Sequence, residues 1–207
     1  MPEGKSKIVA LFKEVQSGNK AAFDEVFFLY HDRLLAFAKQ YTKQVESAEE
    51  LTSELFVKIW LKRNDLSKIT NPEVYLYVSI KNACLNLIRA DTKRNKVFTP
   101  WPEEPSFEKD LTQHTLKFED KELEKLLNMA IQKLPEQRRI IFSLIKEQGL
   151  KSNAVAEILG LSIRTVENQL YKAIKVLADS ISEYLGYHPQ AKMTKKRMDF
   201  NLCLFFL

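Results

Sequence analysis

The stretch SNAVAEILGLSIRTV, residues 152–166, decides the fold of the second half of this chain. A helix-turn-helix needs a small residue where its two helices meet, and Ala156 stands at that place. It also needs a residue that tolerates positive φ at the turn, which Gly160 provides four positions later. Ser152 and Ser162 are side chains suited to capping the first and the second helix. We therefore predict two short helices joined by a tight turn.

The second of these helices has one apolar and one polar side. Its predicted inner stripe consists of Val166, Leu170, Ala173, Ile174 and Leu177. The opposite side carries Arg, Asn, Gln and Lys, which are the side chains that contact base edges and phosphates in a major groove. The predicted DNA-reading residues are Arg164, Thr165, Glu167, Asn168, Gln169, Tyr171 and Lys172, with Lys175 on the flank. The alternative is an ordinary solvated helix face. The spacing of the Ala, Gly, Ser and Val residues within 152–166, however, matches a helix-turn-helix and favours a DNA-binding function.

Helical periodicity extends through the rest of the chain. Apolar residues recur at spacings of three and four over 23–41 and over 51–60. A third helix is expected to begin at Asn71 and Pro72, a capping residue followed by proline at the first helical position, and to run through Ile88. Residues 123–133 predict another helix, and Pro135 begins one that Gly149 ends. Since strand-like alternation is nowhere sustained, we predict an all-α fold of two small helical domains.

The domains are separated by a proline-containing linker. Residues 97–118 include Pro100, Pro102 and Pro105, which are incompatible with a helix interior. The predicted organisation is a first domain over 1–96, the linker over 97–118, a second domain over 119–187 and a tail over 188–207. The tail has a basic stretch followed by the apolar sequence FNLCLFFL, which is too short to span a bilayer. Its role stays open between docking on a protein, contact with a membrane surface and no dedicated role.

The net charge of +5 is small, but it is unevenly distributed. Residues 79–96 contain five cationic side chains against Asp91 alone, whereas residues 97–125 contain eight acidic and four basic side chains. Such blocks are evidence about binding partners rather than about fold. They are consistent with a nucleic-acid contact along the third helix and with an acidic linker.

Several function classes have no support in the sequence. Cys84 and Cys203 are far apart, and His31, His114 and His188 have no ligand spacing, so neither a disulfide scaffold nor a metal site is expected. The five glycines form no phosphate-binding loop, and no Ser or Cys lies in a catalytic motif. We expect no cofactor, no small-molecule substrate and no enzymatic activity. Without an apolar signal core or an 18-residue apolar run, a cytoplasmic protein with no stable membrane insertion is expected.

The motifs together resemble those of the extracytoplasmic-function (ECF) sigma factors, small two-domain members of the sigma-70 family of bacterial RNA polymerase subunits. The matching segments are AFDEVF (22–27), AEELTSELFVKIW (48–60), YLYVSIKN (75–82) with Arg89, LPEQRR (134–139) and the helix-turn-helix (152–166). They cover about residues 18–187 in the order of the family. The resemblance implies a sigma domain 2, a linker and a sigma domain 4, and a role in transcription initiation.

The resemblance implies that the helix around residues 49–60 binds the clamp helices of the polymerase β′ subunit, and it also implies contact with the β flap. The implied polymerase-binding residues are Glu49, Glu50, Ser53, Glu54, Phe56 and Trp60. Ser53 stands where the family usually has Gln. For Phe56 and Trp60 the alternative is a place in the hydrophobic core.

The third helix is the one implied to open and read the −10 promoter element, while the helix-turn-helix reads the −35 element. Melted DNA needs cations for its phosphates and flat or amide-bearing side chains for unstacked bases. The implied residues are Tyr75, Tyr77, Lys81, Asn82, Asn86, Arg89, Lys93 and Arg94. Asn82 matches a family position near the pocket for a flipped base, and Asn86 stands where the family often has Asp. For the two tyrosines the alternative is burial in the helical bundle.

The resemblance also implies a role for the acidic linker and a regulatory partner. Glu103, Glu104, Glu108 and Asp110 are candidates to occupy the RNA exit channel as an RNA mimic, although a solvated spacer explains the same charges. Such factors are usually held inactive by an anti-sigma protein, which is thus an expected partner besides core polymerase and promoter DNA. Two other functions remain open. One is a regulator that binds duplex DNA without polymerase through its helix-turn-helix, with a dimerisation or sensing domain. The other is a helical interaction module with no DNA role.

Overall fold

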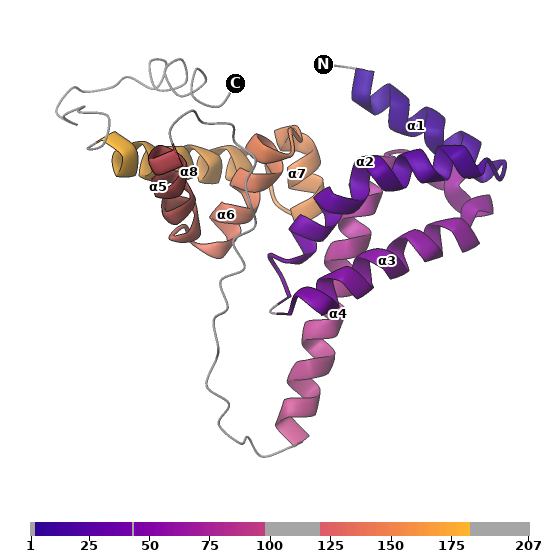
Figure 1. Cartoon of the computed structure of the whole chain (residues 1–207), viewed down its shortest axis with the longest axis horizontal. Coiled ribbons are helices and arrows are strands. Elements are labelled where there is room, and N and C mark those ends of the chain that lie inside the picture. The colour runs from indigo at the N-terminus through magenta and orange to yellow at the C-terminus, as the bar shows by residue number, and fades with distance from the viewer. Residues whose placement is uncertain (1–2, 43, 98–120, 183–207) are drawn as a thin grey trace. The chain divides into compact units, whose positions relative to one another are not determined.

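The computed structural model describes residues 3–42, 44–97 and 121–182 of the chain. These residues belong to two compact units, Met1–Leu111 and Thr112–Leu207 (Figure 1). Every regular element in the described ranges is helical, which confirms the all-α prediction. The prolines of the predicted linker and the whole predicted tail, 188–207, lie outside the described residues. No helix within the described ranges is long and apolar enough to cross a membrane.

The first unit contains α1 (Glu3–Gln16), α2 (Lys20–Ala38), α3 (Val45–Leu61), the 3₁₀ helix η1 (Arg63–Lys68) and α4 (Pro72–Val97). α2, α3 and α4 pack against one another, and α1 packs across α2, η1 and α4. Their apolar stripes meet in a continuous core, because side chains three and four residues apart share one helix face. Core side chains include Val26, Leu34, Phe37, Ile59, Leu76 and Ile80.

Two helices of this unit, α2 and α4, begin at an asparagine whose side chain caps the helix, whereas α3 has no side-chain cap. The backbone N–H of Ala22 donates to Oδ1 of Asn19 at 3.3 Å at the start of α2. At the start of α4, the N–H of Val74 donates to Oδ1 of Asn71 at 3.5 Å, and Pro72 is the first helical residue. The predicted start of the third helix is therefore confirmed.

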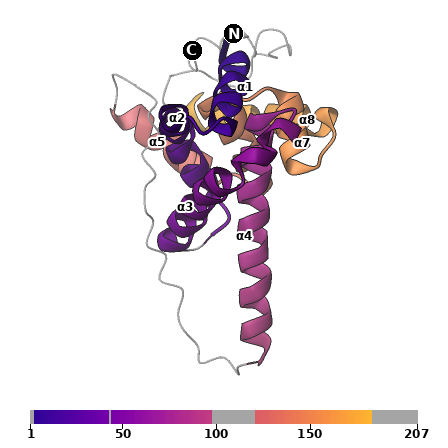
Figure 2. The ribbon, with the colours of Figure 1, turned by 90° about the vertical axis from the view of Figure 1, so that its right-hand side faces the viewer.

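The helix α4 is longer than its hydrophobic pattern indicated. It runs nine residues past Ile88 to Val97, although Cys84 is the last fully buried side chain among those described in this helix, which end at Lys93. Figure 2 shows its second half continuing beyond α1, α2 and α3. The side chains from Ile88 to Lys93 are all exposed. The segment from Ile88 to Lys93 is thus held by the packing of the first half of the helix and is exposed around its circumference.

The second unit contains α5 (Lys121–Gln132), α6 (Glu136–Phe142), the π-helical segment η2 (Ser143–Glu147), α7 (Ser152–Leu159) and α8 (Ile163–Ser182). α8 packs against α5, α6 and α7. Its core cluster is Leu127, Ala130, Ile131, Leu134, Phe142, Ala173 and Leu177, with Leu170 and Ile174 packed against it. Because Val166 is also buried, the predicted inner stripe of this helix is confirmed. α8 spans 20 residues and is not the short helix expected.

Of the features predicted for the helix-turn-helix, the Gly160 turn and the Ser162 cap are present in the structure, whereas the Ser152 cap is not. Gly160 ends α7 in the left-handed region, with φ 69° and ψ 38°. The N–H of Thr165 donates to Oγ of Ser162 at 3.0 Å, so Ser162 caps α8 as predicted. The prediction that Ser152 caps α7 is wrong, because the extended residue at the N-cap is Lys151 (φ −75°, ψ 149°) and Ser152 is already helical. Lysine offers no side-chain acceptor for the first backbone N–H groups, and α7 has no side-chain cap.

Candidate nucleic-acid interface

The outer face of α8 is formed by the residues predicted from the sequence. Arg164, Glu167, Asn168, Tyr171 and Lys172 are all exposed. In a helix each residue advances by about 100°, so these positions lie on one side, opposite the buried stripe. The Gly160 turn and the Ser162 cap fix where this face begins. The arrangement presents two cations, a carboxylate, an amide and an aromatic ring on one exposed face.

Thr165 and Gln169 lie at the edges of this face rather than on it. Both are half-buried, and each has a partner within the unit. The hydroxyls of Thr165 and Ser162 are 2.8 Å apart. Nε of Arg138 in α6 donates to Oε1 of Gln169 at 3.2 Å, across 31 residues of sequence. The structure therefore links the predicted DNA-reading helix to α6 through a pair that the sequence alone did not indicate.

A second polar stripe runs along α4. Tyr75, Asn82, Asn86, Arg89 and Lys93 are exposed and follow one another at spacings of seven, four, three and four. Since 3.6 residues make one turn, these side chains lie on one face. Nη1 of Arg89 donates to Oδ1 of Asn86 at 3.3 Å, so the cation and the amide are neighbours on the surface. The stripe extends from the packed half of α4 into its projecting half.

Two other residues predicted on α4, Tyr77 and Lys81, are placed differently. Tyr77 is 0% exposed, and its ring packs edge-on against Phe37 at 5.3 Å between centroids. Burial raises the pKa of the Tyr77 hydroxyl above its usual range. Tyr77 is therefore a core residue, which was the alternative to DNA binding left open for the two tyrosines, and a ring so buried is not available to stack on a base. Lys81 is half-buried, and desolvation lowers its pKa. The side chain of Arg94 lies outside the described side chains.

On α3, a mixed acidic and apolar stripe is exposed. Glu50, Ser53 and Glu54 are exposed as the sequence indicated, and Glu54 pairs with Lys58 at 2.7 Å. The stripe continues through Val57 and Leu61, whose exposed fractions are 57% and 70%. Neither residue was predicted from the sequence to bind polymerase. Their spacing of seven and eleven from Glu50 is the signal that places them on the same face.

The two aromatic residues predicted on α3 lie in an aromatic cluster with α2. Phe56 is 2% exposed, with its ring centroid 4.8 Å from that of Phe27. Phe56 is therefore a core residue, which was the alternative to polymerase binding that its sequence position left open. Trp60 is half-buried against Phe23 at 5.1 Å, and the guanidinium of Arg63 lies over its ring at 5.0 Å. Glu49, the remaining predicted residue, is exposed to one side of the stripe.

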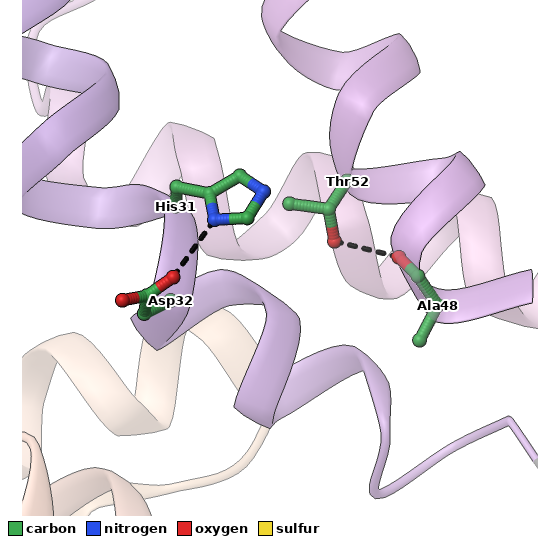
Figure 3. Close-up of polar contacts among 4 residues, drawn as sticks. All are labelled: His31, Asp32, Ala48 and Thr52. Atoms are coloured by element: carbon green, nitrogen blue, oxygen red, sulfur yellow. Dashed lines mark hydrogen bonds and ion pairs between the residues drawn. The ribbon is translucent and has the colours of Figure 1, made fainter. Parts of the chain in front are cut away.

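Figure 3 shows two polar contacts, one within α2 and one within α3. The buried hydroxyl of Thr52 donates to the carbonyl oxygen of Ala48 at 2.7 Å, so it is satisfied inside α3. Nδ1 of His31 lies 2.9 Å from Oδ1 of Asp32, while the imidazole stacks on Phe27 at 4.6 Å. Each of these polar contacts lies within a single helix, and the ring of His31 also reaches α3, with its centroid 6.1 Å from that of Phe56. Within the described residues no group of three or more His, Cys, Asp or Glu is placed to hold a metal ion.

Each of the two units matches a known protein family. The Sigma-70 region 2 family matches residues 27–94, and the Sigma-70 region 4 family matches residues 124–177. The first match covers the α3 and α4 stripes, and the second covers the helix-turn-helix. Their order along the chain is the order that the sequence motifs indicated.

Relatives and solved structures agree with this assignment. The chain is 22% identical over 181 residues to the RNA polymerase sigma-H factor of Pseudomonas aeruginosa, covering 84% of this chain and 94% of the relative. It is 21% identical over 184 residues to the ECF RNA polymerase sigma-E factor of Haemophilus influenzae, covering 83% and 94%.

Two solved structures share the fold. CnrH, in complex with the cytosolic domain of CnrY, has a TM-score of 0.53 at 18% identity, covering 84% of this chain and 96% of that chain. The sigma factor RpoE of Bartonella quintana, in complex with the anti-sigma factor NepR, has a TM-score of 0.52 at 20% identity, covering 77% and 96%. With both regions matched in order, the chain belongs to the sigma-70 family of RNA polymerase sigma factors, in its ECF branch, and is a non-catalytic transcription initiation factor.

Proposed function

We propose that this sigma factor directs core RNA polymerase to promoters by placing α8 in the major groove of a −35 element. The observation that carries the proposal is the outer face of α8. Arg164, Asn168 and Lys172 are exposed one turn apart, directly after the Gly160 turn. The major groove admits an α-helix, and these side chain types recognise base edges and phosphates within it. Glu167 and Tyr171 complete the face.

The −10 element is assigned to the α4 stripe. Arg89 and Lys93 supply cations for phosphates, and Asn82 and Asn86 supply amides for the edges of unstacked bases. Tyr75, which is 37% exposed, supplies a ring on which a base can stack. Because α4 projects beyond the bundle, a single strand can follow this stripe over several turns. The stripe therefore supports a role in holding the melted promoter strand.

The α3 stripe is assigned to the β′ clamp helices of the polymerase. Glu50 and Glu54 supply negative charge, and Val57 and Leu61 supply apolar surface that a helical partner would bury. Burial of a leucine side chain contributes about 1.5–3 kcal/mol, so these two residues would dominate the affinity of the contact. Glu49, Ser53 and Trp60 lie at its margins. The β flap is assigned to the second unit from the family resemblance.

An anti-sigma protein is proposed as the regulatory partner. Two proteins that share this fold, CnrH and RpoE, were solved in complexes, RpoE with the anti-sigma factor NepR. Such a protein would act by covering the α3 or α8 surface. With polymerase as its main partner, the chain would work in the bacterial cytoplasm.

The proposal is tested by reconstitution with bacterial core polymerase. We expect a stable complex, transcripts that depend on a promoter, and protection of the −35 region in a footprint. Association with core polymerase without any protection of the −35 region would contradict the assignment of α8. Binding to free duplex DNA with no core association would instead favour the regulator that acts without polymerase, which family membership already argues against.

A further inference from the structure

The hydrogen bond between Arg138 and Gln169 connects two helices of the second unit. Arg138 lies on α6, whose next turn supplies the core residue Phe142, and α6 packs against α8. Nε of Arg138 donates to Oε1 of Gln169 at 3.2 Å. Both side chains are half-buried at the edge of the DNA-reading face. The pair is therefore held by the packing of the unit before any DNA is bound.

The chemistry of this bond restricts what Gln169 can offer to DNA. A glutamine amide has an acceptor and two donors, and a free glutamine recognises adenine by accepting from N6 and donating to N7. Arginine has donors only, so its partner atom must be the amide oxygen. With Oε1 engaged by Arg138, the amide presents mainly its two N–H donors. Such a group matches a base edge that offers acceptors, and guanine offers both N7 and O6 in the major groove.

Arg138 adds further hydrogen-bond donors beside those of Gln169. Among the described residues, its side chain makes this one hydrogen bond. Its two Nη groups, which carry donors only, are thus left for DNA oxygens or nitrogens. The edge of α8 next to α6 is therefore a surface of donors, formed by Gln169 and Arg138 together.

We propose that Arg138 is a positioning residue that sets the base preference of Gln169, making it favour guanine over adenine at one position of the −35 element. This rests on the proposed function of α8. Gln169 touches the base, and Arg138 acts through it by fixing which end of the amide faces the groove. Adenine is disfavoured because its N6 amino group would meet another donor.

The test is a −35 library transcribed by the reconstituted holoenzyme, with every single-base substitution measured in parallel. The position read by Gln169 is the one whose preference disappears in Gln169→Ala. At that position the wild type is expected to favour guanine over adenine. Arg138→Met should lower the guanine-to-adenine ratio about tenfold, because the released amide can rotate and pair with adenine. Gln169→Glu, which presents only acceptors to the amino group of cytosine, should shift the preference towards cytosine.

Arg139→Met is the matched control. Arg139 is the next residue of α6, and its Nη1 donates to the carbonyl oxygen of Gln132, away from Gln169. The Arg139→Met substitution removes one positive charge, as Arg138→Met does, and is expected to leave the guanine-to-adenine ratio unchanged. An equal change of this ratio in the two variants, or an unchanged ratio in Arg138→Met, would overturn the positioning role. If Arg138→Met fails to fold, the Gln169→Glu variant provides the test. Retention of the preference for guanine in that variant would overturn the positioning role of Arg138. Loss of all −35 dependence in the wild type would instead overturn the proposed function of α8.

Discussion

Replacing Gly160 by alanine tests the turn that precedes α8, the helix proposed to read the −35 element. Gly160 has φ 69°, a conformation that disfavours any residue with a Cβ. A Cβ built at this position would meet nothing within 4 Å. The expected cost is therefore conformational alone, about 1–2 kcal/mol, with no added term for a clash. For a domain of 60–100 residues a loss of 1 kcal/mol lowers the melting temperature by roughly 4–8 °C.

Hydrogen exchange read by mass spectrometry is the assay, because it reports α7 and α8 separately from the first unit. Gly160→Ala should accelerate exchange in both helices about five- to thirty-fold if they open together, which corresponds to the same 1–2 kcal/mol. Gly160→Asn is the matched variant and should cost less, since asparagine tolerates the left-handed region better. A cost of asparagine equal to that of alanine would refute the conformational argument. So would a loss well above 2 kcal/mol, which requires a clash that the structure does not contain.

Three further predictions concern other elements. Lys151→Ser should stabilise α7 by about 1 kcal/mol by supplying the missing cap, seen as slower exchange of its first turn; faster exchange there would contradict it. Asn82→Ala should impair promoter opening, seen as weaker permanganate reactivity of thymines near −10, with core binding unchanged; full reactivity would remove Asn82 from the interface. Leu61→Asp should weaken core polymerase binding at least tenfold, whereas Asp24→Asn, an exposed change on α2, should not; equal affinities would remove Leu61 from the docking surface.

Local signals in the sequence were sufficient for much of the fold. Gly160, Ser162 and the pair Asn71-Pro72 lie where the structure needs a left-handed residue or a cap, because each requirement is set by a few neighbouring residues. The Ser152 cap was wrong by one position, since the extended backbone that defines an N-cap falls at Lys151. α1 was not predicted at all, although it covers one side of α2 and α4.

For the candidate sites, residue type alone was a weaker guide than helical position. Tyr75 and Tyr77 are two residues apart and so differ by about 200° around α4, which means that only one of them can face outward. Phe56 was attractive as an aromatic docking residue, yet it faces α2, while the aliphatic Val57 beside it is exposed. The contact between Arg138 and Gln169 required the packing of α6 on α8, which no local pattern encodes.

Site-specific photo-crosslinking in the holoenzyme bound to a promoter tests the central claim most directly. A benzoylphenylalanine in place of Asn168 samples the α8 face, one in place of Asn86 samples the α4 stripe, and one in place of Asp24 is the control on α2. We predict crosslinks from position 168 to the −35 element and from position 86 to the −10 element, with none from position 24. Crosslinks from position 168 to the −10 region, or none from positions 168 and 86 in a transcribing complex, would contradict it.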